Sequence, residues 1–154
     1  MKTFTLKIVL FFGLLFSAKS GIPQNILTDG NFNSTNVITP HVTAVPPVNI
    51  WCSWFNTGAV VNTSVVSGVC KYEILNAGMQ SWEVQLIQWG FPLIIGNQYR
   101  LTFDVRADAN RNFGVFIGEN EGQWTNLNAS NYLQKATPNW QTKTIDFIAT
   151  AVFS

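Results

Sequence analysis

The chain has 154 residues, of which 11% are charged and 47% hydrophobic, and its formal net charge at pH 7 is +1. This balance lacks the basic excess that attracts nucleic acid or anionic membranes, and a single histidine with no CxxC pair argues against a zinc site. The length suits one domain with a hydrophobic core and is too short for two.

Residues 1–20 have the pattern of a secretory signal peptide. Lys2 and Lys7 give a positive start, residues 8–16 form a short apolar run, and residues 18–20 place small side chains where signal peptidase cuts. We predict cleavage before Gly21 and a secreted domain over residues 21–154, with six basic and eight acidic residues. The alternative, an uncleaved membrane anchor, is disfavoured by the shortness of the apolar run. After cleavage we expect no membrane contact.

The rest of the chain predicts short β-strands separated by Gly, Asn and Pro. Alternating side chains at 69–74 put Cys70, Tyr72 and Ile74 on one face, whereas residues 58–66 show no clear alternation. No helix longer than a turn is predicted, so we expect an all-β sandwich. The predicted strands outside the central stretch are a short first strand that ends in a bend within 25–32, and strands at 48–55, 69–74, 113–118, 132–133 and 142–148.

The central stretch is Ser81–Ala107. Alternating apolar residues on either side of a turn at Gly96-Asn97 predict a half-buried antiparallel pair, with Val84 and Leu86 on one strand and Leu101, Phe103 and Val105 on the other. On its solvent face we expect groups of the kind that hold a sugar, namely Trp82, Gln85, Gln88 and Trp89. Trp51 and Trp54 are three residues apart on one strand, so they face opposite sides and one of them is expected in the core.

The two cysteines, Cys52 and Cys70, predict a disulfide. They are the only pair in a chain expected to enter an oxidising compartment, and they flank a plausible hairpin. The alternative is two buried thiols. Closing this loop would contribute about 3 kcal/mol in the chain-entropy description.

Four motifs occur in a familiar order: NILTDGNFN from Asn25, SGVCKYEILNAG, the central stretch from Ser81, and NWQTKTIDF ending at Phe147. Together they resemble the carbohydrate-binding modules of the family 4, 9 and 22 group, and the resemblance covers residues 25–147. It implies a jelly-roll β-sandwich of two antiparallel sheets, of the kind attached to secreted glycoside hydrolases.

The resemblance also implies a ligand site, a groove on the concave sheet. Carried over, the motif strand supplies Trp82 and Gln85, and a second aromatic comes from Trp124 or, as second choice, Phe116. Arg106 and Asp104 would complete the groove from the neighbouring strand, with Gln88 as a further polar contact. The implied ligand is a neutral polysaccharide of β-glucan or xylan type. We expect a monomer without a cofactor that holds a hydrolase on its substrate.

Two departures from the family pattern bear on calcium and on the fold. The family often has an acidic residue where this chain has Asn33, and it usually ends in a strand with an acidic residue that this chain lacks. Both features are associated with a structural calcium, so the departures argue against one here. We also expect the sandwich to lack its last strand.

Other functions are weaker predictions. Glycoside hydrolysis needs two carboxylates about 5 to 10 Å apart, but Glu119 and Glu121 lie in a polar segment typical of a solvated turn. A secreted adhesion or structural sandwich that binds a protein through the same aromatic face stays open, as does the N-terminal part of a longer hydrolase. A polar, amide-rich rim favours a sugar over a protein partner, and this chain offers Gln85, Gln88, Asn120 and Asn126.

Overall fold

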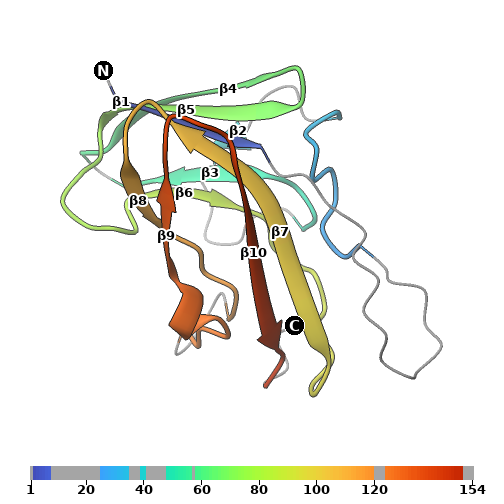
Figure 1. Cartoon of the computed structure of the whole chain (residues 1–154). Helices are drawn as coiled ribbons and strands as arrows, with labels where there is room; N and C mark the ends of the chain where they lie inside the picture. The colour runs from blue at the N-terminus through green and yellow to red at the C-terminus, as the bar shows by residue number, and fades with distance from the viewer. Residues whose placement is uncertain are drawn as a thin grey trace.

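The computed structural model describes residues 2–7, 25–34, 39–40, 48–56, 58–119 and 124–150. Within these ranges there is no α-helix, and the one helical segment is a 3₁₀ turn, η1 (Ala129–Asn131), which confirms the all-β prediction (Figure 1). His41 and the C-terminal residues 151–154 lie outside the described ranges. The strands are β1 (Lys2–Lys7), β2 (Thr39–Pro40), β3 (Cys52–Phe55), β4 (Val60–Val66), β5 (Val69–Asn76), β6 (Val84–Ile87), β7 (Gln98–Ala107), β8 (Arg111–Gly114), β9 (Leu133–Ala136) and β10 (Gln141–Ile148).

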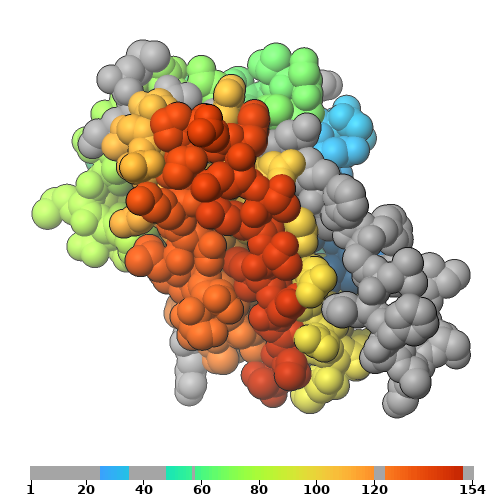
Figure 2. Space-filling model, viewed as in Figure 1, coloured from blue at the N-terminus to red at the C-terminus, as the bar shows by residue number. Residues whose placement is uncertain are grey.

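The strands form one large sheet and two smaller groups. The large sheet has the order β10-β7-β1-β5-β4 and is antiparallel throughout. A second sheet has the order β2-β3-β6, in which β3 and β6 are antiparallel and the two-residue β2 is parallel to β3, while β8 pairs with β9. In Figure 1 the long strands β7 and β10 run side by side in front of β3 and β6. Figure 2 shows the surface of β9 and β10 as one continuous area beside β7.

Side-chain alternation explains most of these strands. In β7 the side chains of Phe103, Val105 and Ala107 are buried and that of Arg106 is exposed, and in β10 Ile145 and Phe147 are buried between exposed neighbours. The strand β4 was missed by the sequence pattern. Its residues alternate only between exposed and half-buried because it is the outer strand of the sheet, so polar and apolar residues contrast less.

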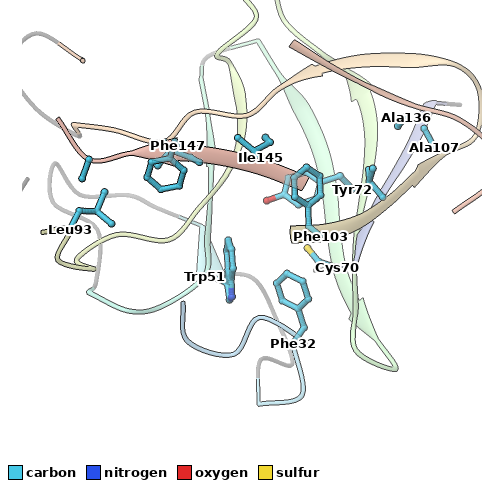
Figure 3. Packing of buried hydrophobic residues seen from close by; sticks show 13 residues of the cluster. Phe32, Trp51, Cys70, Tyr72, Leu93, Phe103, Ala107, Ala136, Ile145 and Phe147 are labelled. Atoms are coloured by element: carbon cyan, nitrogen blue, oxygen red, sulfur yellow. The ribbon is translucent and has the colours of Figure 1, made fainter. Parts of the chain in front are cut away.

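The core lies between the large sheet and β3–β6, and aromatic residues fill much of it (Figure 3). Phe32, from the N-terminal segment, packs against Trp51 with ring centroids 5.3 Å apart. The two sheets also meet through Tyr72 on β5, whose hydroxyl lies 2.5 Å from that of Ser53 on β3 and donates to the Gln85 carbonyl at 3.2 Å. Burial of this apolar surface drives the two layers together, and the buried hydroxyl pair is satisfied within it.

The predicted central hairpin is wrong. β6 pairs with β3, whereas β7 pairs with β10 and β1, so the two strands belong to different sheets. The intervening residues 88–97 cross from one sheet to the other, with Leu93 buried and the Gly96 amide donating to the Ala149 carbonyl at 2.8 Å. Alternation shows which face of a strand is buried but does not identify the neighbouring strand.

The predicted disulfide is also wrong, because both cysteines are free and buried. Cys70 belongs to the core cluster. Cys52 lies between Trp51 and Ser53, which both face the core, so its side chain points to the other side of β3, where its thiol lies 3.7 Å from the Ile87 carbonyl. The Cys70 side chain faces the core and the Cys52 side chain faces away from it. A disulfide between them would therefore require the backbone to move.

No helix in the described part of the chain has the length and apolar character needed to cross a lipid bilayer.

Candidate ligand-binding site

Two tryptophans lie next to each other on the outer face of the β3–β6 sheet. The ring centroids of Trp54 and Trp82 are 5.7 Å apart and their planes are inclined by 34°. On β3, Ser53 bonds to Tyr72 and Phe55 packs against the core, so Trp54 between them points outward. The side chain of Trp82 is 48% exposed. The pair therefore presents a wide aromatic surface outside the core.

Gln85 lies beside these rings. It stands opposite Trp54 in the β3–β6 register, and its neighbours Val84 and Leu86 pack against the core, which directs its own side chain to the outer face. Its Nε2 donates to the Trp82 carbonyl at 2.7 Å. This bond holds a neutral amide at the edge of the two rings. We call Trp54, Trp82 and Gln85 the aromatic platform.

The loop that carries Trp82 is held by a buried carboxylate. The Oε2 atom of Glu83 accepts hydrogen bonds from the amides of Met79 and Gln80, and the Asn56 amide donates to the Glu83 carbonyl at 3.1 Å. Gly78 has φ +76°, and a Cβ there would overlap the Glu83 carboxylate. The Gly at position 78 and the buried acid thus fix the turn that enters β6, a role that the sequence pattern did not assign to Glu83.

Gln88 takes a structural role instead of a place on the platform. Its side chain is buried, with Oε1 accepting from the Thr28 amide at 2.9 Å and Nε2 donating to the Thr28 carbonyl at 2.8 Å. Both ends of the amide therefore hold the segment 25–34 against β6. We do not place Gln88 among the ligand contacts.

Arg106 and Asp104 lie on the opposite side of the sandwich, which corrects their predicted place in the groove. They project from the outer face of the large sheet, where the Arg106 guanidinium lies 4.9 Å from the centre of the Trp140 ring. The Asp104 carboxylate accepts from the Thr142 hydroxyl at 2.6 Å. The error follows from the wrong hairpin, because a β7 paired to β6 would have put these side chains next to Trp82.

Phe116 and Trp124 are exposed on two segments, 115–119 and 124–128, that pair antiparallel through Gly118 and Asn126 and that we call the second hairpin. Its ladder includes the Leu127 amide donating to the Ile117 carbonyl at 2.8 Å. The buried Asn128 side chain accepts from the Ile117 amide and donates to the Val115 carbonyl, both at 2.8 Å. Both aromatic side chains are exposed on this hairpin. No ring contact within the described residues joins either of them to the platform, so their part in binding stays a prediction.

The chemistry of the platform is neutral. The large upward pKa shifts lie in the interior, where burial raises the pKa of the Cys70 thiol to about 12 and also raises the pKa of Tyr72. Among the described residues, no three His, Cys, Asp or Glu side chains cluster as metal ligands. Glu119 accepts from the Thr125 hydroxyl at 3.2 Å, and Glu121 lies outside the described residues. Indole faces and an amide suit an uncharged ligand with C–H faces and hydroxyls.

Comparison with known proteins agrees with this geometry. The family model described as "Carbohydrate binding domain" matches residues 24–152. A solved structure titled "CBM4 structure and function" is similar with a TM-score of 0.67 and 26% sequence identity, covering 80% of this chain and 79% of that chain. None of the curated proteins matches this chain. The chain therefore belongs to the family of carbohydrate-binding domains, which bind sugars without catalysing their cleavage.

Proposed function

We propose that the protein is a secreted module that binds a neutral polysaccharide of β-glucan or xylan type on the aromatic platform. The observation that carries this proposal is the Trp54–Trp82 pair, with centroids 5.7 Å apart beside the Gln85 amide. Sugar rings stack their C–H faces on flat aromatic surfaces, and amides exchange hydrogen bonds with hydroxyls at little cost in desolvation.

The charge distribution supports a neutral ligand. The platform residues carry no charge, while the charged pairs Arg100–Asp146 and Arg111–Asp108 lie on other strands. Two stacked rings contribute on the order of 1 kcal/mol each, so single-site binding should be micromolar or weaker. Weak binding is enough for a tether, because a linked second site works through effective concentration. The role we propose is to hold an associated glycoside hydrolase on its substrate, outside the cell.

Calorimetry or affinity electrophoresis of the full chain against soluble β-glucans, xylans and mannans tests the ligand class. We expect binding to a β-glucan or a xylan and none to mannan. In Trp82→Ala, binding should fall about tenfold or more, equivalent to about 1.4 kcal/mol. Trp54→Ala should behave similarly.

The matched control is Trp140→Ala. Trp140 is 42% exposed, close to the 48% of Trp82, but it lies with Arg106 on the outer face of the large sheet. It should keep affinity within about twofold. Equal losses in Trp82→Ala and Trp140→Ala, or an unchanged affinity in Trp82→Ala, would remove the platform from the proposal. Phe116→Ala and Trp124→Ala then test whether the second hairpin contributes to the same ligand.

A further inference from the structure

The strand at the centre of the large sheet is supplied by the first residues of the chain. β1 lies between β5 and β7 and is antiparallel to both. It pairs through residues 2–6 with Cys70–Ile74 and through residues 4–7 with Asp104–Ala107. Residues 8–24 connect it covalently to the next described segment. We call the space between β5 and β7 the seam.

In this structure β5 and β7 are joined only through β1. Because β1 is antiparallel to both neighbours, β5 and β7 run parallel to each other on its two sides, and each keeps one other partner, β4 or β10. Without β1 the large sheet becomes two separate antiparallel pairs, β4–β5 and β7–β10. The backbone groups of Cys70–Ile74 and Asp104–Ala107 that face the seam would lose their partners next to the core, which is costly for buried peptide groups.

The seam also selects a pattern of residues. The register places Phe4 opposite Tyr72 and Ala107, and it places Leu6 opposite Cys70 and Val105. Those four partners all have buried side chains. Directly opposed residues share a face of the sheet, so the register decides which residues of the segment stand opposite these buried partners.

We propose that the seam is a strand-acceptor site, which binds an extended segment with apolar residues two positions apart, and that residues 2–7 are its occupant. This peptide site is separate from the aromatic platform. Its occupant lies inside the predicted signal peptide, so cleavage before Gly21 would cut the covalent link. The strand is then held by the hydrogen-bonded ladder to β5 and β7, as an added strand is held at a sheet edge.

The test uses the full chain with one protease site inserted between residues 8 and 24. After folding and cleavage, native mass spectrometry should find the N-terminal fragment still bound. Removing the fragment should speed hydrogen exchange of residues 70–74 and 104–107 at least tenfold, and adding a synthetic peptide of residues 1–20 should restore the slow exchange. Amides of β3 and β6 provide the internal reference, since they pair outside the seam.

Proline variants locate the contact. Thr5 pairs with Lys71 on one side and Arg106 on the other, so Thr5→Pro removes a ladder donor whichever neighbour its amide faces. A 1–20 peptide with Thr5→Pro should fail to restore slow exchange, whereas a peptide with Ser17→Pro should succeed. Since the substitution is in the added peptide, folding of the large fragment is unaffected. Exchange at the seam that is unchanged by removing the fragment, or equal restoration by both peptides, would overturn the proposal. Glycan binding is measured separately, so neither result depends on the platform.

Discussion

At the scale of single residues, Glu83 decides the position of Trp82. Its buried carboxylate accepts hydrogen bonds from the amides of Met79 and Gln80. Without this acceptor, the two amide donors of the loop would be left unsatisfied. The aromatic platform depends on such contacts because Trp82 lies in a loop, and small shifts of its indole change the overlap with a sugar ring.

We therefore predict that Glu83→Ala lowers the free energy of unfolding by about 1 to 3 kcal/mol and weakens glycan binding by more than twofold. Glu73→Ala is the control, since the Glu73 carboxylate accepts from the Asn62 side chain at 3.2 Å on the surface of β4–β5 and its loss should change stability by less than about 0.5 kcal/mol. Urea unfolding and calorimetry measure the two effects. Equal behaviour of both variants would contradict the positioning role.

At the scale of elements, one amide side chain replaces missing strand pairing. The Asn128 side chain accepts from Ile117 and donates to Val115, so it continues the pattern of β8 beyond Gly114 and precedes η1. The base of the second hairpin is thus held by this buried side chain together with backbone bonds such as that from the Leu127 amide to the Ile117 carbonyl.

We expect Asn128→Ala to cost about 2 kcal/mol, because two buried backbone groups lose their partners. Hydrogen exchange should rise first at residues 115–117 and 127–128, before the large sheet is affected. Asn131→Ala, at an exposed position of η1, should leave both unchanged. Uniform destabilisation in Asn128→Ala, without faster exchange in the second hairpin, would show that the Asn128 side chain does not stabilise that hairpin locally.

Element prediction from the sequence was accurate where amphipathic alternation was strong. The segments at 69–74 and 142–148 became β5 and β10, and the strand around Phe103 became β7. The pairing of β6 with β7 failed, because chain proximity favours a hairpin whereas residues 88–97 carry the chain to the other layer. That one error also misplaced Arg106.

At the scale of the whole molecule, stability depends on keeping three interior groups protonated, because burial raises the pKa of the Cys52 thiol as well as those of Tyr72 and Cys70. Burial raises the pKa of Tyr72 above its ordinary value, and it raises the pKa of Cys70 from 9.0 to about 12. The unfolded chain releases these protons at lower pH than the folded one. The stability from the neutral forms is therefore complete below about pH 9 and is lost as the pH rises toward about 12.

Urea unfolding between pH 7 and pH 11 should show a falling free energy of unfolding above about pH 9, by at most about 1.4 kcal/mol per pH unit for each group. Cys70→Ala removes one thiol and should reduce the decline between about pH 9 and pH 10, before Tyr72 contributes, and leave the part that comes from Cys52. The quantity compared is the slope of the free energy of unfolding against pH. A uniform loss of stability in the variant does not change this slope. An identical slope in both proteins would show that the thiol does not titrate on unfolding.

The sequence by itself determined the fold class and the family, and it predicted a ligand-binding role for the stretch around Trp82. These follow from local information: alternation with a period of two, turn residues, and an ordered set of motifs. The opposite orientation of Trp51 and Trp54 also came from spacing alone, and the structure confirms it, with Trp51 in the core and Trp54 outside.

Only the tertiary structure decided which strands meet and therefore which side chains share a surface. Arg106 lies on the outer face of the large sheet, away from the platform, and the Gln88 side chain bonds to Thr28. Trp54 lies beside Trp82, and Cys70 faces the core whereas Cys52 faces away from it. The tertiary structure also paired residues 2–7 with β5 and β7, although their local pattern suits an export signal. The physical reason is that strand pairing is set by burial summed over the whole core, and no single segment carries that information.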